Sequence, residues 1–382
     1  MRTIDPPYTV AVSNDLFQQL SFANLGGPVC PQLQHLRWTS TYGWERSQEF
    51  FSPHLVSVDF WHSIKNFRSD LGLGSAISSL PTTHLEKLTL AGYPPHTAPI
   101  HSALSETVRR LNTCFKQIDV RSSLSGAAWG HLASLPKLEL LSVDDTPSVE
   151  VLKSIPHNPT FPALEHVTLE LSSRHQHLPV LFFLLKSSPL TEVTVKESVK
   201  IRHFGVPSEV AIAMLKVELH RSVNTLAFTG FHPADLTFIS HLGPFSSLTT
   251  LECDTRCQEP TQCVFPLTDS DIEQLASGLP QLVALYLGHK CTYNHPSTTI
   301  KSMVSLSTHC PSLGTLYLPC DLTNISEDVK MESGEPDPRL KTRSSCTLRV
   351  LGLHWMVRPK DIEALETMKS SLRHLFPLLR FP

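Results

Sequence analysis

One short pattern recurs along almost the entire chain and constrains its fold more than any other feature. The pattern is an apolar residue, two variable residues, a second apolar residue, one variable residue and a third apolar residue, as at Leu282, Leu285 and Leu287. Twelve copies occur, with a mean spacing of about 29 residues, which is typical of a solenoid of stacked repeats. Their first apolar residues are Leu33, Leu55, Leu85, Phe115, Leu138, Leu164, Leu190, Val223, Leu248, Leu282, Leu313 and Leu348.

Each copy of the pattern predicts a strand followed by a turn and a helix. The second and third apolar residues are two positions apart, so they share one face of an extended backbone. Segments with helical spacing of apolar residues occur between copies, namely residues 269–279, 297–308, 146–155 and 360–368. Strands joined by crossover helices pair in parallel. A doubly wound sheet is the rival, but it needs longer apolar strands and a glycine-rich turn that the sequence lacks.

The composition agrees with a repeat protein and excludes some partner classes. The chain has 382 residues, 41% of them hydrophobic and 18% charged, so it can bury a large core. It exceeds the roughly 250 to 300 residues at which a single compact core stops growing. Its 32 Lys and Arg residues against 35 Asp and Glu residues leave a formal charge of -3. This balance predicts neither a nucleic-acid partner nor an anionic membrane partner.

The cysteines and the N-terminal residues bear on the compartment. Nine Cys residues are spread along the chain, unlike the dense framework of a small disulfide-stabilised domain. The first 20 residues lack the apolar segment of a signal peptide, and the apolar run at residues 178–185 is shorter than the roughly 20 residues of a membrane span. We therefore expect reduced thiols and a cytoplasmic and/or nuclear protein.

The repeats also define the expected domain organisation. No linker rich in Pro, Gly and Ser divides the chain, so residues 28–370 are predicted to form one repeat domain. Residues 1–27 form an N-terminal lead-in that caps the first repeat, and the apolar residues 371–382 cap the last one, because an end repeat has an uncovered apolar face. Residues 324–345 are charged and have little to bury, which predicts a mobile loop.

Two groups of possible metal ligands occur, and both are weak candidates. They are Cys253, Cys257 and Cys263 in one group, and His289, Cys291 and His295 in the other. The cysteine spacings of four and six differ from the paired two-residue gaps of zinc ribbons and fingers. The second group is most simply a loop that follows a strand. We expect no metal and no cofactor.

Catalytic motifs are equally scarce. Residues 72–75 (GLGS) are the segment most similar to a phosphate-binding loop, but no Lys follows them, so a turn is predicted there instead. No Gly-x-Ser-x-Gly nucleophile motif occurs. The sequence therefore predicts a protein that is not an enzyme.

The face of the predicted sheet that points away from the helices is the expected binding surface. It carries the residues two, four and six positions after each first apolar residue. In the first nine repeats its charged residues are Arg37, Lys87, Arg121 and Lys196 against Asp59, Asp119, Asp144, Glu170, Glu192, Glu252 and Asp254. Four cations against seven carboxylates predict a protein or peptide partner of basic or mixed polar character.

Aromatic residues at these positions are candidate anchors, because aromatic side chains dominate binding hot spots. Tyr286 and Tyr317 lie among small residues such as Ala284 and Gly288. Packing of each Tyr on its neighbour between adjacent strands explains them equally well, and both interpretations stay open. Trp38 and Phe60 occupy the third apolar position and are predicted to be core. The candidate partner-binding residues are Trp61, Glu192, Glu252, Tyr286, Tyr317 and His354.

Three phrases carry a likeness to a known family: CPQLQHLRW at residues 30–38, LTDSDIEQLASGLPQL at residues 267–282 and LSTHCPSL at residues 306–313. They resemble the leucine-rich-repeat domain of F-box proteins, especially the large group in basidiomycete fungi, over residues 28–370. The resemblance implies an α/β leucine-rich-repeat solenoid, or horseshoe, of about 12 irregular repeats. Its parallel sheet would lie on the concave face and its helices on the convex face.

The resemblance also implies a function: a non-catalytic arm that recognises a protein or peptide substrate for a cullin-based (SCF-type) ubiquitin ligase. One departure from the family is that no F-box pattern occurs before Leu33. The ligase adaptor is therefore expected as a partner only if an F-box lies upstream of Met1. The alternative is a free-standing leucine-rich-repeat scaffold or adaptor with no ubiquitin-ligase role.

Overall fold

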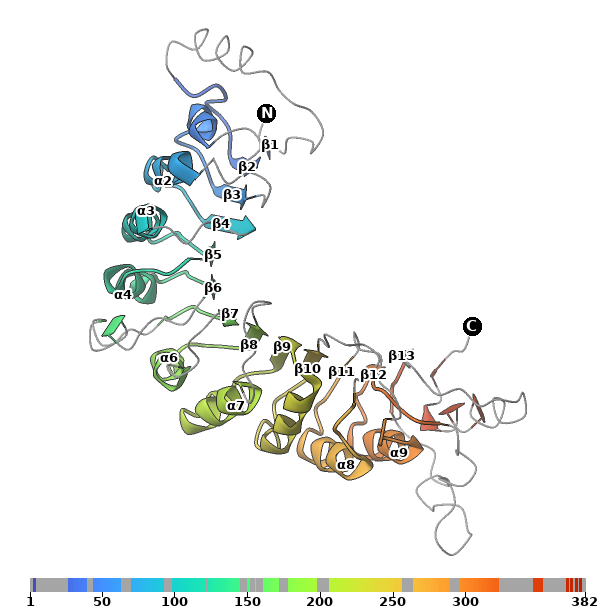
Figure 1. Ribbon diagram of the computed structural model, residues 1–382. Coiled ribbons are helices and arrows are strands. Elements are labelled where there is room, and N and C mark those ends of the chain that lie inside the picture. Colours follow the sequence, from blue (N-terminus) through green and yellow to red (C-terminus); the bar gives the residue numbers. More distant parts are fainter. Residues whose placement is uncertain are drawn as a thin grey trace, which may run out of the picture. The chain divides into compact units, whose positions relative to one another are not determined.

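The computed structural model divides the chain into two compact units, Met1–Leu190 (unit 1) and Thr191–Pro382 (unit 2). Each unit is a solenoid segment with a parallel sheet on one side and helices on the other (Figure 1). The described residues are 3–4, 27–39, 44–62, 70–92, 98–120, 122–144, 150–151, 155, 161–171, 178–197, 206–255, 264–288, 296–322, 346–352, 369–370, 372–373, 375–376 and 378–379.

In unit 1 each strand pairs in parallel with the strand of the next repeat. The strands are β1 (Thr3–Ile4), β2 (His35–Thr39), β3 (Ser57–His62), β4 (Lys87–Gly92), β5 (Gln117–Val120), β6 (Leu140–Asp144) and β7 (His166–Leu171). The helices are the 3₁₀ helix η2 (Glu45–Phe50) and α2 (Asp70–Ser78), α3 (Ala98–Arg109), α4 (Gly126–Ser134) and α6 (Leu178–Leu185). The repeat pattern did not predict β1.

Unit 2 continues the same arrangement of strand and helix. Its strands are β8 (Glu192–Glu197), β9 (Thr225–Phe231), β10 (Thr250–Thr255), β11 (Ala284–Leu287), β12 (Thr315–Tyr317) and β13 (Val350–Gly352), paired in parallel in this order. Its helices are α7 (Val206–Lys216), α8 (Asp269–Gly278) and α9 (Ile300–His309), with the 3₁₀ helices η5 (Leu219–Arg221) and η6 (Pro233–His241). The predicted α/β solenoid is confirmed.

The apolar pattern accounts for the core of both units. All twelve first apolar residues are fully buried, from Leu33 to Leu348. Trp38 and Phe60, predicted to be core, are also buried. Helix α3 covers the sheet with Ile100, Leu104 and Val108, whose spacing of four residues places them on one side of a helix. In each unit, core residues from the strands and the helices thus form an apolar layer between the sheet and the helices.

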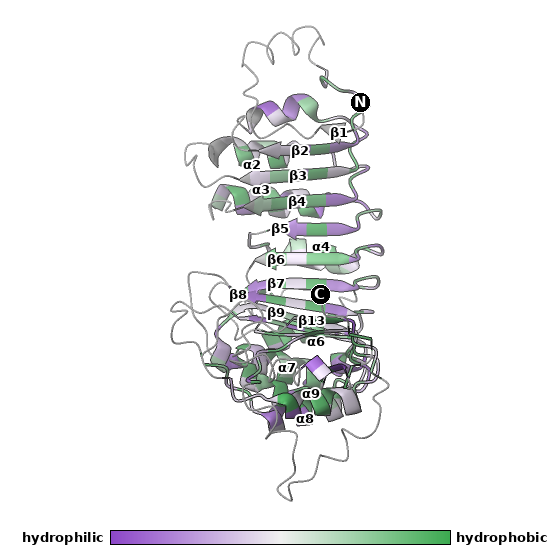
Figure 2. Cartoon of the chain, turned by 90° about the vertical axis from the view of Figure 1, so that its right-hand side faces the viewer, coloured by the Kyte–Doolittle hydropathy of each residue, from purple (hydrophilic) through white to green (hydrophobic). Residues whose placement is uncertain are grey.

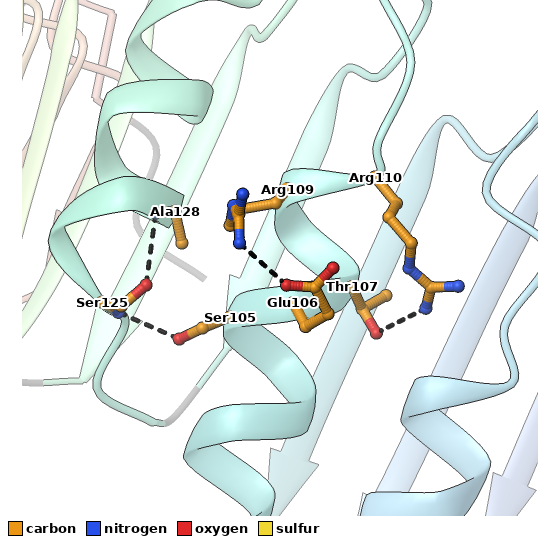
Figure 3. A network of polar contacts seen from close by, with 7 residues as sticks. All are labelled: Ser105, Glu106, Thr107, Arg109, Arg110, Ser125 and Ala128. Atoms are coloured by element: carbon orange, nitrogen blue, oxygen red, sulfur yellow. Dashed lines mark hydrogen bonds and ion pairs between the residues drawn. The ribbon is translucent and has the colours of Figure 1, made fainter.

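Polar contacts join the helices of adjacent repeats in unit 1 (Figure 3). The backbone N–H of Ser125 donates to Ser105 Oγ at 2.9 Å, and Ser125 Oγ accepts from the N–H of Ala128 at 3.3 Å, which caps α4. On the other side of α3, the buried Thr107 donates to the carbonyl of Ile77 in α2 at 2.9 Å. These bonds satisfy backbone N–H and C=O groups at the helix ends, which have no partner within their own helix.

The expected turn at residues 72–75 is wrong, because these residues lie inside helix α2. Leu73, Ala76 and Ile77 are buried and lie on the side of α2 that covers the sheet. A Cβ added at Gly74 would lie 3.7 Å from the Pro99 carbonyl oxygen, so α3 passes close to this position. Burial of the apolar residues offsets the cost of glycine in a helix, which is about 1 kcal/mol per residue.

Several expectations fall outside the described residues. They concern the loop at residues 324–345, the helical segment at residues 360–368, most of the N-terminal lead-in at residues 1–27 and most of the helical segment at residues 146–155. Near the C-terminus, Leu372 and Phe376 are fully buried. Among the described helices, none is long and apolar enough to cross a membrane.

Candidate functional site: the open sheet face

We call the side of each sheet that is not covered by helices the open sheet face. Side chains alternate along a strand, so every second residue of each strand points to this face and the others enter the core. Figure 2 shows strands β2 to β7 of unit 1 side by side, with the helices behind them. The paired registers place the central residues of these strands in one row: Arg37, Asp59, Thr89, Asp119, Ser142 and Thr168.

In unit 1 two cations of the open sheet face contact neighbouring residues of the same sheet. The guanidinium carbon of Arg37 lies 5.0 Å from the centroid of the Trp61 ring, which is within the range of a cation–π contact. Lys87 Nζ lies 3.7 Å from Asp59 Oδ1. Of the cations predicted for the open sheet face, Arg37 and Lys87 are the ones described in unit 1, and each has a partner in the same sheet. The Trp61 side chain is still 41% exposed.

In unit 2 the central row of the open sheet face is aromatic at its later strands. The registers align Thr194, Ala227, Glu252, Tyr286, Tyr317 and Gly352. The rings of Tyr286 and Tyr317 stack, with their centroids 5.1 Å apart and an angle of 18° between the ring planes. This separation is close to the spacing of adjacent strands, about 4.8 Å. The two tyrosines do pack on each other, and both remain half-buried at the surface.

The acidic residue Glu252 lies directly beside this pair. It is half-buried, and its registered neighbours are Ala227 on one side and Tyr286 on the other. Among the described residues of this face in unit 2, Glu192, Glu252 and Asp254 oppose a single cation, Lys196, which gives a net charge of -2. Burial raises the pKa of the Cys253 thiol, and the negative charges of its neighbours Glu252 and Asp254 raise it further.

The structure therefore brings together part of the predicted site. Glu252, Tyr286 and Tyr317 lie on three consecutive strands of unit 2, and Glu192 lies on β8, two strands from β10. Trp61 belongs to unit 1 and is described there on β3. His354 and Arg121 fall outside the described residues, and only the backbone register of Asp144, opposite Glu170, is known.

One residue of this surface was not among the candidates. Val350 of β13 is 46% exposed and pairs in register with Thr315. The signal was present in the sequence, because Val350 lies two positions after the first apolar residue Leu348. Ala284 of β11 registers with Thr315 as well, on its other side. Ala284 and Val350 therefore add two apolar side chains to the open sheet face near the tyrosine pair.

Four of the six described thiols, Cys253, Cys310, Cys320 and Cys346, are buried, whereas Cys30 is half-buried and Cys114 is exposed. Burial raises the pKa of Cys310 to about 12, and Cys310 Sγ donates to the carbonyl of Leu279 at 3.5 Å. Because the thiolate is the reactive and metal-binding form, such a thiol is inert near neutral pH. Within the described part of the chain, no three His, Cys, Asp or Glu side chains are grouped so that they could hold a metal ion. The predicted weak candidates Cys257, Cys263, His289, Cys291 and His295 lie outside that part.

The fold and this surface define the chain as an α/β solenoid protein with an open sheet face of aromatic, acidic and small residues. No model of a known protein family matches the sequence. A search of curated proteins also found no match.

Proposed function

We propose that the chain is a non-catalytic protein-binding arm whose open sheet face holds a protein or peptide partner. The observation that supports this proposal best is the row of Glu252, Tyr286 and Tyr317 on consecutive strands of unit 2. Stacked aromatic rings beside an acidic group offer both a desolvated contact area and a directional polar contact, the combination found at binding hot spots. A parallel sheet also holds these side chains on rigid backbone.

The resemblance to leucine-rich-repeat domains of F-box proteins extends the proposal. By that resemblance, the partner is a substrate of a cullin-based (SCF-type) ubiquitin ligase, and the ligase adaptor binds only if an F-box lies upstream. The alternative is a leucine-rich-repeat scaffold or adaptor that binds its partner without ubiquitination.

Affinity purification from the native cell extract tests the proposal. The bait is the full chain, compared with an open-face variant, Glu192→Lys/Glu252→Lys. A matched control, Glu209→Lys/Glu273→Lys, makes the same change in net charge at exposed positions on helices α7 and α8. We expect the open-face variant to lose a set of proteins that the control retains, with both variants keeping the melting temperature of the parent within a few degrees.

Two further comparisons complete the design. Proteins that bind the parent and both variants equally would place the binding surface elsewhere and contradict the proposal. A second bait that includes the genomic sequence upstream of Met1 separates the two roles. Recovery of a cullin and its adaptor with that bait supports the ligase role, whereas open-face partners without either support the scaffold.

A further inference from the structure

We propose that the open sheet face of unit 2 binds a basic, extended protein segment through an arginine whose guanidinium lies against Tyr286 and pairs with Glu252. This inference rests on the proposed function and specifies the partner of that face. It is carried by the order of residues across β9, β10, β11 and β12, by the stacking of the tyrosine rings and by the net charge of the face.

The stacking determines which ring surface of Tyr286 faces Glu252. One face of the Tyr286 ring is covered by the ring of Tyr317 from β12. The opposite face is therefore directed toward β10, whose residue in register is Glu252. A Tyr side chain reaches further from its Cα than a Glu side chain does. A planar cation that contacts the carboxylate from outside the sheet therefore also meets the outer part of this ring.

Glu252 has a small residue on its other side. Its neighbour on β9 is Ala227, a residue with a side chain of one carbon atom. Two positions along β10, Asp254 adds a second negative charge on the same face. A guanidinium at Glu252 would thus have a carboxylate below it, an aromatic face on one side and a small residue on the other.

These features favour arginine over lysine. Arginine forms paired hydrogen bonds with a carboxylate and stacks on aromatic faces, whereas an ammonium group is a compact and strongly hydrated charge. Unit 1 shows this chemistry within the chain itself, where Arg37 lies 5.0 Å from the Trp61 ring. In unit 2 the residue at the equivalent row of β9 is alanine, so we assign the cation to the partner.

The position of Glu192 predicts a second basic residue in the partner. Glu192 lies on β8, two strands from β10, and two residues earlier in register than Glu252. With strands about 4.8 Å apart and a rise of about 3.3 Å per residue, the two Cα atoms are roughly 12 Å apart. An extended segment covers this distance in three or four residues. We therefore expect a basic residue three or four positions from the arginine.

Selection from a random twelve-residue peptide library on the purified full chain tests this inference. We expect the selected peptides to share an arginine with a second Lys or Arg three or four positions away. Each selected peptide is then synthesised with arginine, lysine or citrulline at the shared position. Citrulline keeps the planar shape of arginine and lacks its charge, so we expect it to weaken binding about tenfold.

The protein variants connect the peptide to the site. Against Glu252→Gln, the loss caused by citrulline should shrink to less than about twofold, because the charge partner is already absent. Tyr286→Leu should weaken binding of the arginine peptide about tenfold, and Tyr286→Phe, which keeps the ring, should change it by less than about twofold. Glu273→Gln on α8 is the matched control and should leave binding unchanged.

The possible results separate this inference from the proposed function. Peptides without arginine that still lose affinity for Glu192→Lys/Glu252→Lys overturn the arginine site and leave the open face as the binding surface. Peptides that bind the parent and all open-face variants equally count against both. Selection of no peptide above background also overturns the inference, since an extended segment is its stated ligand.

Discussion

The imidazole of His220 illustrates how one residue can make stability depend on pH. His220 is half-buried in the middle of η5, and its ring meets the ring of Phe245 edge-on with centroids 5.8 Å apart. Burial lowers the pKa of His220 below its usual 6.5, and the positive charge of Arg221 lowers it further, against smaller raising effects of Glu218 and the Met214 backbone. The folded state therefore favours the neutral imidazole.

We predict that this residue makes unit 2 less stable in mild acid. Because the pKa is lower in the folded state than in the unfolded state, the stabilisation is complete above pH 6.5 and is lost as the pH falls through the folded pKa. The measurement is urea unfolding of the parent and of His220→Gln between pH 8 and pH 5. The free energy of unfolding of the parent should fall more steeply with acid than that of the variant. Equal pH dependence of the free energy of unfolding in the parent and the variant would show that the pKa of His220 is the same in the folded and unfolded states, which would contradict the prediction.

Single residues also show what the sequence can and cannot predict. Burial of the twelve first apolar residues was predictable, because the regular spacing of apolar residues indicates which positions of a strand or helix lie on the same side. The contact between His220 and Phe245 was not, since neither residue belongs to the repeat pattern. For Tyr286 and Tyr317 the sequence placed both on the open sheet face but left their mutual packing undecided. Their stacking depends on ring orientation, which spacing does not specify.

At the scale of elements, one carboxylate joins two consecutive repeats of unit 2. Asp269 is the first residue of α8, and its Oδ1 accepts the N–H groups of Thr299 and Ser302 at 2.8 and 3.1 Å. Their hydroxyl groups also donate to this carboxylate, at 2.8 and 2.5 Å. Thr299 is the N-cap of α9, so Asp269 places a negative charge at the positive end of the next helix.

We predict that Asp269→Ala destabilises unit 2 by about 1 to 3 kcal/mol, because it leaves N-terminal donors of α9 without a charged acceptor. Asp269→Asn should lose less, since its amide oxygen still accepts one of these bonds. Chemical unfolding measures the free energies, with Ser270→Ala, at an exposed position of the same helix turn, as the control. A loss for Asp269→Ala no greater than for Ser270→Ala would mean that the bonds between repeats contribute nothing net.

Elements with a clear apolar period were predictable, and those that depend on contacts between repeats were not. The segments at residues 269–279 and 297–308 were predicted to be helical from their spacing, and helices α8 (Asp269–Gly278) and α9 (Ile300–His309) lie there. Residues 72–75 were predicted to form a turn in place of a phosphate-binding loop, but they lie in α2. The close approach of α3 to Gly74 is a contact between repeats that the local sequence does not show. Strand β1 was missed because two residues carry no periodicity.

At the scale of the whole molecule, each repeat pairs mainly with the repeats before and after it. In unit 2, Leu285 of β11 is fully buried and registers with Leu251 of β10 and Leu316 of β12. Stability in such a solenoid is approximately a sum of repeat terms and nearest-neighbour interface terms. A defect in one repeat should therefore act most strongly on the adjacent repeats and less on distant ones.

We predict that Leu285→Ala lowers the free energy of unfolding by about 2 to 5 kcal/mol, the cost of a cavity in a packed core. Val283→Ala, at a position that is 45% exposed two residues earlier, should cost less than about 0.5 kcal/mol. Native-state hydrogen exchange should then show the greatest loss of amide protection in β10, β11 and β12 and a smaller loss in β8. An equal loss in β8 to β13 would show that unit 2 opens as one cooperative body, and a cost below about 1 kcal/mol would contradict the core position of Leu285.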